Sequence, residues 1–119
     1  MLDDKVLTDQ EQVILQRKAE DDEGSYTCYL FKSGLDKILK KVGEECAETI
    51  IAAKNLKTAV NDTEHLKSEL ACEVSDLIYH LQVMLCDVGV SIQDVLLEMD
   101  KRTQKTGNKK IMKKVDKNT

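Results

Sequence analysis

Five carboxylates at helical spacing are the residues of this sequence best suited to chemistry. Glu44, Glu45 and Glu48 lie within about one helical turn, and Glu73 and Asp76 are three residues apart further along the chain. At about 100° per residue, the members of each set fall on one side of a helix. Carboxylates that lie close together repel one another, and a hard cation such as Mg²⁺ or Mn²⁺ relieves this repulsion. The spacing therefore predicts a divalent-metal site if the two sets face each other.

The other reactive residue types indicate no different chemistry. No C-x-x-C pair is present and no histidine lies near a cysteine at ligand spacing, so a zinc site is not indicated for Cys28, Cys46, Cys72 and Cys86. His65 and His80 are too few for a Ser-His-Asp or Cys-His apparatus. Acidic residues are also common on solvated helix faces. An acidic ridge that holds no ion is therefore the competing interpretation.

Two long amphipathic helices are expected to carry the carboxylates. Apolar residues recur at three- and four-residue steps over residues 35–55 and again over residues 62–88, and this period predicts a helix in each segment. A short loop joins the segments, so the helices are expected to form an antiparallel hairpin whose middle parts face each other. Each set of carboxylates lies near the middle of its helix. The hairpin would therefore bring all five to one rim.

Shorter helices are expected on either side of the hairpin, over residues 8–22 and 26–32 and from residue 92 to about residue 99. Capping and helix-breaking residues predict where the helices begin and end. The expected N-caps, in chain order, are Thr8 or Asp9 with support from Glu11, then Ser25, then Asp62 or Thr63, and finally Ser91, while Gly89 is expected to end the second long helix.

The predicted fold class is all-α, an antiparallel helical hairpin with short flanking helices. A hairpin of this size buries a thin core, and small domains often need additional stabilisation. Both long helices have enough apolar surface to pack against a second hairpin. We therefore expect a homodimer in which two hairpins form a four-helix bundle.

Composition restricts the class of protein. Of 119 residues, 41% are hydrophobic, 34% are charged and none is proline, a mixture too apolar for a disordered chain and too charged for a membrane protein. No apolar run approaches the roughly 20 residues of a membrane-spanning helix, and residues 1–18 contain no apolar signal core. We therefore expect a cytoplasmic protein that makes no membrane contact.

Charge is divided unevenly along the chain. Residues 1–100 contain 10 basic and 21 acidic residues, whereas residues 101–119 contain 8 basic residues and 1 acidic residue. We expect a single domain over residues 1–103 and a flexible basic tail over residues 104–119. Because the acidic body would repel phosphate groups, nucleic acid is not expected as the partner.

Several sequence blocks resemble one family of enzymes. The segments GEECAE at residues 43–48 and EVSD at residues 73–76 fit the E-E-x-x-E…E-x-x-D pattern of the all-α, MazG-like nucleotide pyrophosphohydrolases. Further blocks narrow the resemblance to the phosphoribosyl-ATP pyrophosphohydrolases of histidine biosynthesis: GSYT at residues 24–27, GLDKILKKVG at 34–43, AAKN at 52–55 and DLIYHL at 76–81. The resemblance covers roughly residues 24–102.

This resemblance implies hydrolysis of phosphoribosyl-ATP to phosphoribosyl-AMP and pyrophosphate with Mg²⁺, or alternatively Mn²⁺, as the cofactor. It implies a catalytic role for all five carboxylates, and metal ligation by Glu45, Glu48, Glu73 and Asp76. The matched positions also include candidates for substrate contact, each with packing or solvation as the competing interpretation: Tyr26, Lys37, Lys40, Lys41, Lys54, Asn55 and His80.

Two other functions are compatible with the same residues. A MazG-like hydrolase of canonical or damaged nucleoside triphosphates would share the metal site and differ in its contacts to base and ribose. A helical interaction module would use the acidic ridge to bind a basic partner and would need no metal. The cyclohydrolase domain that accompanies this activity in some fused enzymes has no counterpart in the cysteine spacing of this chain.

Overall fold

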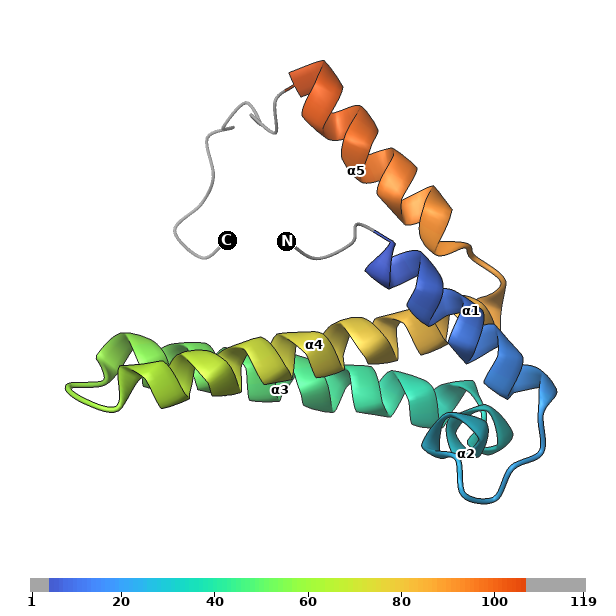
Figure 1. Cartoon of the computed structure of the whole chain (residues 1–119), viewed down its shortest axis with the longest axis horizontal. Coiled ribbons are helices and arrows are strands. Elements are labelled where there is room, and N and C mark those ends of the chain that lie inside the picture. Colours follow the sequence, from blue (N-terminus) through green and yellow to red (C-terminus); the bar gives the residue numbers. More distant parts are fainter. Residues whose placement is uncertain (1–4, 107–119) are drawn as a thin grey trace.

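The computed structural model describes residues 5–106, with side chains described as far as residue 104. Within this part of the chain every regular element is a helix, so the predicted all-α fold class is confirmed. The elements in chain order are α1 (Val6–Ala19), α2 (Tyr26–Ser33), α3 (Leu35–Thr58), α4 (Thr63–Val88) and α5 (Ile92–Thr106). Figure 1 shows α3 and α4 side by side, with α1 and α2 at one end of the pair.

The hairpin of α3 and α4 forms as the apolar period predicts. The helix α3 continues to Thr58, three residues beyond the expected end. The start of α4 and its N-cap residue, Asp62, are as expected. Asp62 adopts a left-handed conformation with φ of 61°, however, and its side chain accepts no capping hydrogen bond. Gly89, with φ of 81°, ends α4 as predicted, because a glycine adopts this conformation without steric cost.

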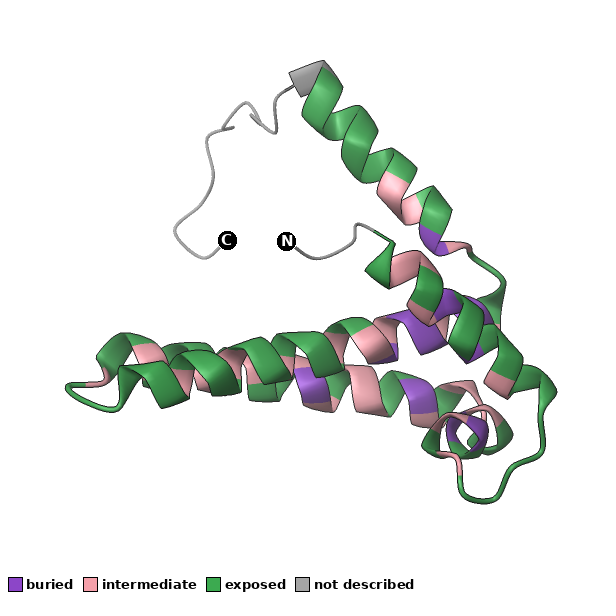
Figure 2. Cartoon of the chain, viewed as in Figure 1, coloured by how far each residue is buried: buried purple, intermediate pink, exposed green. Residues whose placement is uncertain are grey.

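The hydrophobic core lies where α1 and α2 pack against the start of α3 and the end of α4. Ile14, Leu30, Ile38 and Val83 form its centre, each at most 1% exposed. In Figure 2 the buried residues gather at this end of the hairpin, whereas the opposite end is coloured mostly as exposed or intermediate. We call this end of the hairpin, away from the loop that joins α3 and α4, the closed end. Packing at the closed end fixes how α3 and α4 face each other further along.

The prediction for the first helix was wrong at both ends. Helix α1 begins at Val6, after Lys5, with no side-chain cap, and it ends at Ala19. The carboxylate of Glu11 is buried and accepts a hydrogen bond from the backbone N–H of Ile92 at 2.6 Å, so it is not available to support an N-cap. The acidic run that follows Ala19 is unfavourable at the negative end of the helix dipole, which explains the early end.

The caps predicted for the other short helices are confirmed. The Ser25 hydroxyl accepts a hydrogen bond from the N–H of Cys28 at 3.1 Å, and the Ser91 hydroxyl accepts one from the N–H of Gln93 at 3.1 Å. Helix α5 continues to Thr106, into the segment predicted as a tail, and the predicted tail from residue 107 onward lies outside the described residues.

No single helix among the described residues is long and apolar enough to cross a membrane. Within the same residues one bent pair, α4 with residues 92–104 of α5, reaches that length and composition when taken together, with 115° between its two parts.

Candidate active site

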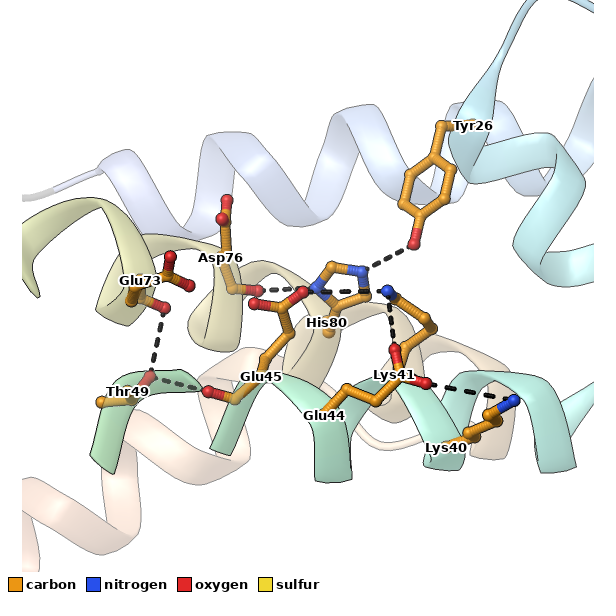
Figure 3. A network of polar contacts seen from close by, with 9 residues as sticks. All are labelled: Tyr26, Lys40, Lys41, Glu44, Glu45, Thr49, Glu73, Asp76 and His80. Atoms are coloured by element: carbon orange, nitrogen blue, oxygen red, sulfur yellow. Dashed lines mark hydrogen bonds and ion pairs between the residues drawn. The ribbon is translucent and has the colours of Figure 1, made fainter. Parts of the chain in front are cut away.

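Three of the five predicted carboxylates converge between the two long helices. Glu45 on α3 and the α4 residues Glu73 and Asp76 each place a carboxylate oxygen within 4.8 Å of the others. Figure 3 shows Glu45 on α3 opposite Glu73 on α4, with Asp76 next to Glu73 on the same helix. We call this group the carboxylate cluster.

The carboxylate cluster is partly withdrawn from water. Glu45 is only 6% exposed, Glu73 is half-buried and Asp76 is exposed. The Oε2 atoms of Glu45 and Glu73 are buried and have no hydrogen-bond partner among the described residues. Buried carboxylate oxygens without partners are energetically costly. Their presence in the cluster is explained if a cation supplies the missing contact.

Burial and mutual repulsion change the acidity of the cluster. Loss of hydration is the main cause that raises the pKa of Glu45, and the nearby Glu48 carboxylate raises it further. The pKa of Glu73 is also raised, first by loss of hydration, then by a hydrogen bond with Glu48, and then by the charge of that carboxylate. Both shifts show carboxylates that lack a positive neighbour strong enough to offset their burial.

The two remaining predicted carboxylates differ from each other. Glu48 lies beside Glu45 and Glu73, as its effect on their acidity shows, but it is exposed and stands outside the converging three. Glu44 instead faces two lysines, with its oxygens 3.0 Å from Nζ of Lys41 and 4.0 Å from Nζ of Lys40. The pKa of Glu44 is lowered, chiefly by its hydrogen bond with Lys41.

A buried histidine connects the carboxylate cluster to α2. The carbonyl of Asp76 lies 2.7 Å from Nδ1 of His80, and because a carbonyl only accepts, Nδ1 carries the proton. In the neutral ring Nε2 then accepts a hydrogen bond from the hydroxyl of Tyr26 at 2.9 Å. Lys41 stands on the same side, with Nζ 3.9 Å from Oε1 of Glu45 (Figure 3).

Comparison with known proteins decides the family. A family model described as phosphoribosyl-ATP pyrophosphohydrolase matches residues 7–103. This chain belongs to that family. The resemblance seen in the sequence blocks is thereby confirmed, and the family model matches most of the chain, α1 included.

Individual members of the phosphoribosyl-ATP pyrophosphohydrolase family agree with this assignment. The chain is 49% identical to a phosphoribosyl-ATP pyrophosphatase of Clostridium novyi over 98 residues, which is 82% of this chain and 81% of the relative. It is 45% identical to one of Listeria welshimeri over 111 residues, 93% of this chain and 98% of the relative. A histidine biosynthesis bifunctional protein of Bacillus subtilis is 50% identical over 97 residues, 82% of this chain but 42% of that protein.

The other substrate-contact candidates of this family member lie at different distances and directions from the carboxylate cluster. Lys37 lies over the ring of Tyr29, with Nζ 5.9 Å from the ring centroid. Asn55 borders a surface pocket of about 190 Å³ next to the cluster, together with Glu48, Glu69 and Glu73. Lys54 is exposed and lies about 180° around α3 from Glu45, so the helix directs it away from the carboxylate cluster.

Thr49 is a further residue of the site that the sequence did not indicate. Its hydroxyl donates to the carbonyl of Glu45 at 2.8 Å and also lies 3.4 Å from the carbonyl of Glu73, so it stands between the two metal-ligand candidates on α3 and α4. The available signal was its position four residues after Glu45, on the face of α3 that meets α4. A threonine on a helix is common, and its contact across the hairpin is visible only in three dimensions.

Proposed function

We propose that this protein hydrolyses phosphoribosyl-ATP to phosphoribosyl-AMP and pyrophosphate in the presence of Mg²⁺, as a step of histidine biosynthesis. Family membership supports the reaction, because the relatives that match most of the chain are named phosphoribosyl-ATP pyrophosphatases. The observation that carries the proposal is the convergence of Glu45, Glu73 and Asp76 within 4.8 Å.

The donor set of the carboxylate cluster fits a hard divalent cation. The three converging oxygens belong to carboxylates, and two oxygens of the cluster are buried without a hydrogen-bond partner in the part of the chain that the structure describes. Glu45, Glu73 and Asp76 would hold the ion, and Mg²⁺ or Mn²⁺ would suit them because both favour carboxylate oxygen. When bound, such an ion neutralises phosphate charge and lowers the pKa of a bound water.

The protein's own side chains then have separable tasks. Without a cation, the carboxylate cluster would repel a triphosphate, so its charge makes binding depend on the metal. Glu48, exposed at the edge of the cluster, lies where it can serve as a further ligand or accept a proton from the attacking water. Attack by water requires no covalent intermediate, which agrees with the absence of a Ser-His-Asp or Cys-His arrangement in the sequence.

The proposed reaction is tested by product analysis with purified protein. Phosphoribosyl-ATP and Mg²⁺ are expected to give equal amounts of phosphoribosyl-AMP and pyrophosphate, and EDTA is expected to stop the reaction. ATP, dCTP and dUTP serve as competing substrates. A preference for a deoxynucleotide would transfer the assignment to a house-cleaning triphosphate hydrolase. Absence of turnover together with absence of Mn²⁺ binding would favour the interaction module.

We also propose that two copies associate through the face of the hairpin opposite the carboxylate cluster. Helical periodicity places Leu39 and Ile50 of α3 and Val74 and Ile78 of α4 on this face. Their exposed fractions lie between 37% and 69%, more than such side chains have in a closed core. Analytical ultracentrifugation should give a dimer for the wild-type protein and a monomer for Ile50→Glu. A wild-type monomer at micromolar concentration would refute the association.

A further inference from the structure

Two exposed tyrosine rings and three lysines gather at one end of the carboxylate cluster. Tyr26 and Tyr29 of α2 are 46% and 49% exposed, and their rings lie at 29° to each other with centroids 6.2 Å apart. Lys37, Lys40 and Lys41 follow in the first turns of α3, and Nζ of Lys37 lies above the Tyr29 ring. We call these five residues the basic aromatic patch.

The patch and the carboxylate cluster form one continuous strip along α3. Lys37, Lys41, Glu45 and Glu48 follow at steps of four, four and three residues, so they share one face of the helix. At about 1.5 Å per residue, Lys37 stands roughly 12 Å along the axis from Glu45. In Figure 3 Glu45, Glu73 and Asp76 lie at one side, and Lys41 and Lys40 lie at the other with Glu44 between them.

The two ends of this strip have opposite charge. Beyond Glu48 lies the pocket that Asn55 borders, and its charged lining residues are all acidic: Glu48, Glu69 and Glu73. At the other end Lys40 forms an ion pair with Glu44, 4.0 Å away, and the Lys40 side chain is 67% exposed. Exposed ion pairs of this kind are weak, so Lys40 can exchange it for a phosphate. A second anionic group on the substrate therefore fits only the lysine end.

Phosphoribosyl-ATP has such a second anionic group. Its triphosphate is the end that reacts, and its adenine bears a phosphoribosyl group that ATP lacks. We propose that the basic aromatic patch binds this phosphoribosyl-adenine end, with the tyrosine rings against the purine and Lys37 and Lys40 at the ribosyl phosphate. This inference rests on the proposed function. It makes the patch the element that selects phosphoribosyl-ATP over ATP.

The chemistry of both residue types suits these roles. Aromatic faces stack on any base, and lysine ammonium groups bind phosphate as point charges without a fixed geometry. The pKa of the Tyr29 phenol is lowered, first by its hydrogen bond with Lys37, so the ring and the ammonium group are already held together. Lys41 is occupied by Glu44 and lies near Glu45, so it belongs to the border with the carboxylate cluster and not to the distal phosphate.

The test compares two ligands that differ only in the phosphoribosyl group. Lys37→Gln, Lys40→Gln and the double variant are assayed for kcat and KM with phosphoribosyl-ATP, and for the inhibition constant of ATP as a competing ligand. We expect KM for phosphoribosyl-ATP to rise about 10-fold in each single variant and about 100-fold in the double variant, because each variant loses a charged hydrogen bond. The inhibition constant of ATP should stay within about twofold.

Matched variants separate recognition from folding. Lys57→Gln, in the last turn of the same helix, removes an equal charge from an exposed position and should change neither constant. Tyr29→Leu should weaken phosphoribosyl-ATP and ATP about tenfold alike, because both contain adenine, while Tyr29→Phe should restore binding. Circular dichroism checks that each variant is folded.

Each outcome decides the inference. An equal loss for both ligands in the lysine variants would place the lysines at the triphosphate and overturn it, and so would no loss for either ligand. Wild-type protein that releases no pyrophosphate from phosphoribosyl-ATP would refute the proposed function itself. If the wild-type protein is active and the double variant keeps the wild-type selectivity for phosphoribosyl-ATP over ATP, only the role of the patch is refuted.

Discussion

The two halves of the hairpin differ in whether their buried side chains have all their contacts satisfied. At the closed end, Ile38 is fully buried and packs against Leu30 and Val83, and the buried amide of Gln82 donates to the carbonyl of Leu7 at 2.8 Å. Two turns further along the same face of α3, Glu45 is almost as buried, yet one of its oxygens has no partner among the described residues. One half is complete without a ligand, and the other is not.

This difference shows how a small helical fold can support a costly site. A buried carboxylate oxygen without a hydrogen-bond partner opposes folding, so other parts of the molecule must hold α3 against α4. The core at the closed end does this, and the hydroxyl of Thr49 adds a polar contact within the site. The carboxylate cluster can then be optimised for binding a ligand and not for stability. Substitutions in each half can test whether one half stabilises the fold and the other binds the ligand.

Substitution in the carboxylate cluster should give the largest effect. Glu45→Gln and Asp76→Asn each remove a metal-ligand charge while preserving shape, so we expect kcat/KM to fall by about 1,000-fold, equivalent to about 4 kcal/mol of transition-state stabilisation. Helicity measured by circular dichroism should stay at the wild-type value. Glu64→Gln, on an exposed first turn of α4, is the control with equal charge change. Normal turnover in either cluster variant would remove that carboxylate from the proposed mechanism.

Substitution in the closed end should act on stability. Leu30 is 0% exposed, so Leu30→Ala should lower the free energy of unfolding by about 3 kcal/mol through lost burial and a residual cavity. Urea unfolding at fixed protein concentration measures this loss, and Val60→Ala, at a 98% exposed position, should show almost none. If Leu30→Ala and Val60→Ala unfolded at the same urea concentration, the core would not be what holds the hairpin together.

Helical periodicity predicted the hairpin and most of the carboxylate cluster from sequence, but it did not predict the orientation of every acidic side chain. The hairpin and the facing of Glu45 toward Glu73 and Asp76 follow from the spacing of apolar and acidic residues. The orientation of Glu44 does not, because its position allows it to face either the cluster or Lys41, and the choice depends on a long lysine side chain.

The contacts between distant segments were also beyond sequence reasoning. The role of Glu11 as a partner of the Ile92 N–H, and the hydrogen bond between Tyr26 and His80, join residues far apart in the chain. A capping pattern near Thr8 predicted a local use for Glu11, and tertiary packing overrode it. The six-residue segment between α1 and α2 likewise ended α1 earlier than its period suggested.

The acidity of the carboxylate cluster gives a smaller effect on stability. The pKa values of Glu45 and Glu73 are raised above 4.5, the usual value, so the folded state holds these protons more tightly than the unfolded state does. Their contribution to stability is therefore present below pH 4.5 and is lost as the pH rises through the raised values. In metal-free protein at pH 7, Glu45→Gln should raise Tm by about 3 °C.

Addition of Mg²⁺ or Mn²⁺ at pH 7 should raise the Tm of the wild-type protein and leave that of Glu45→Gln nearly unchanged, because a ligand stabilises only the state that binds it. Differential scanning fluorimetry at one protein concentration measures both shifts. If metal-free wild-type protein and Glu45→Gln melt at the same temperature across pH 4 to 8, the buried carboxylate carries no cost, and the contrast between the two halves is lost.

The smallest expected effect marks the border of the cluster. Glu44 is paired with Lys41 at 3.0 Å and its side chain is 43% exposed, so Glu44→Gln should lower kcat/KM by about threefold or less. The small loss arises because Lys41, released from Glu44, is freer to approach Oε1 of Glu45, 3.9 Å away, and to compete there with the metal. Raising the Mg²⁺ concentration should therefore recover the activity of Glu44→Gln but not that of Glu45→Gln. A loss of kcat/KM in Glu44→Gln as large as that in Glu45→Gln, and insensitive to Mg²⁺, would contradict this expectation. Glu44 would then be a fourth carboxylate of the cluster, and its partner Lys41 would belong to the site.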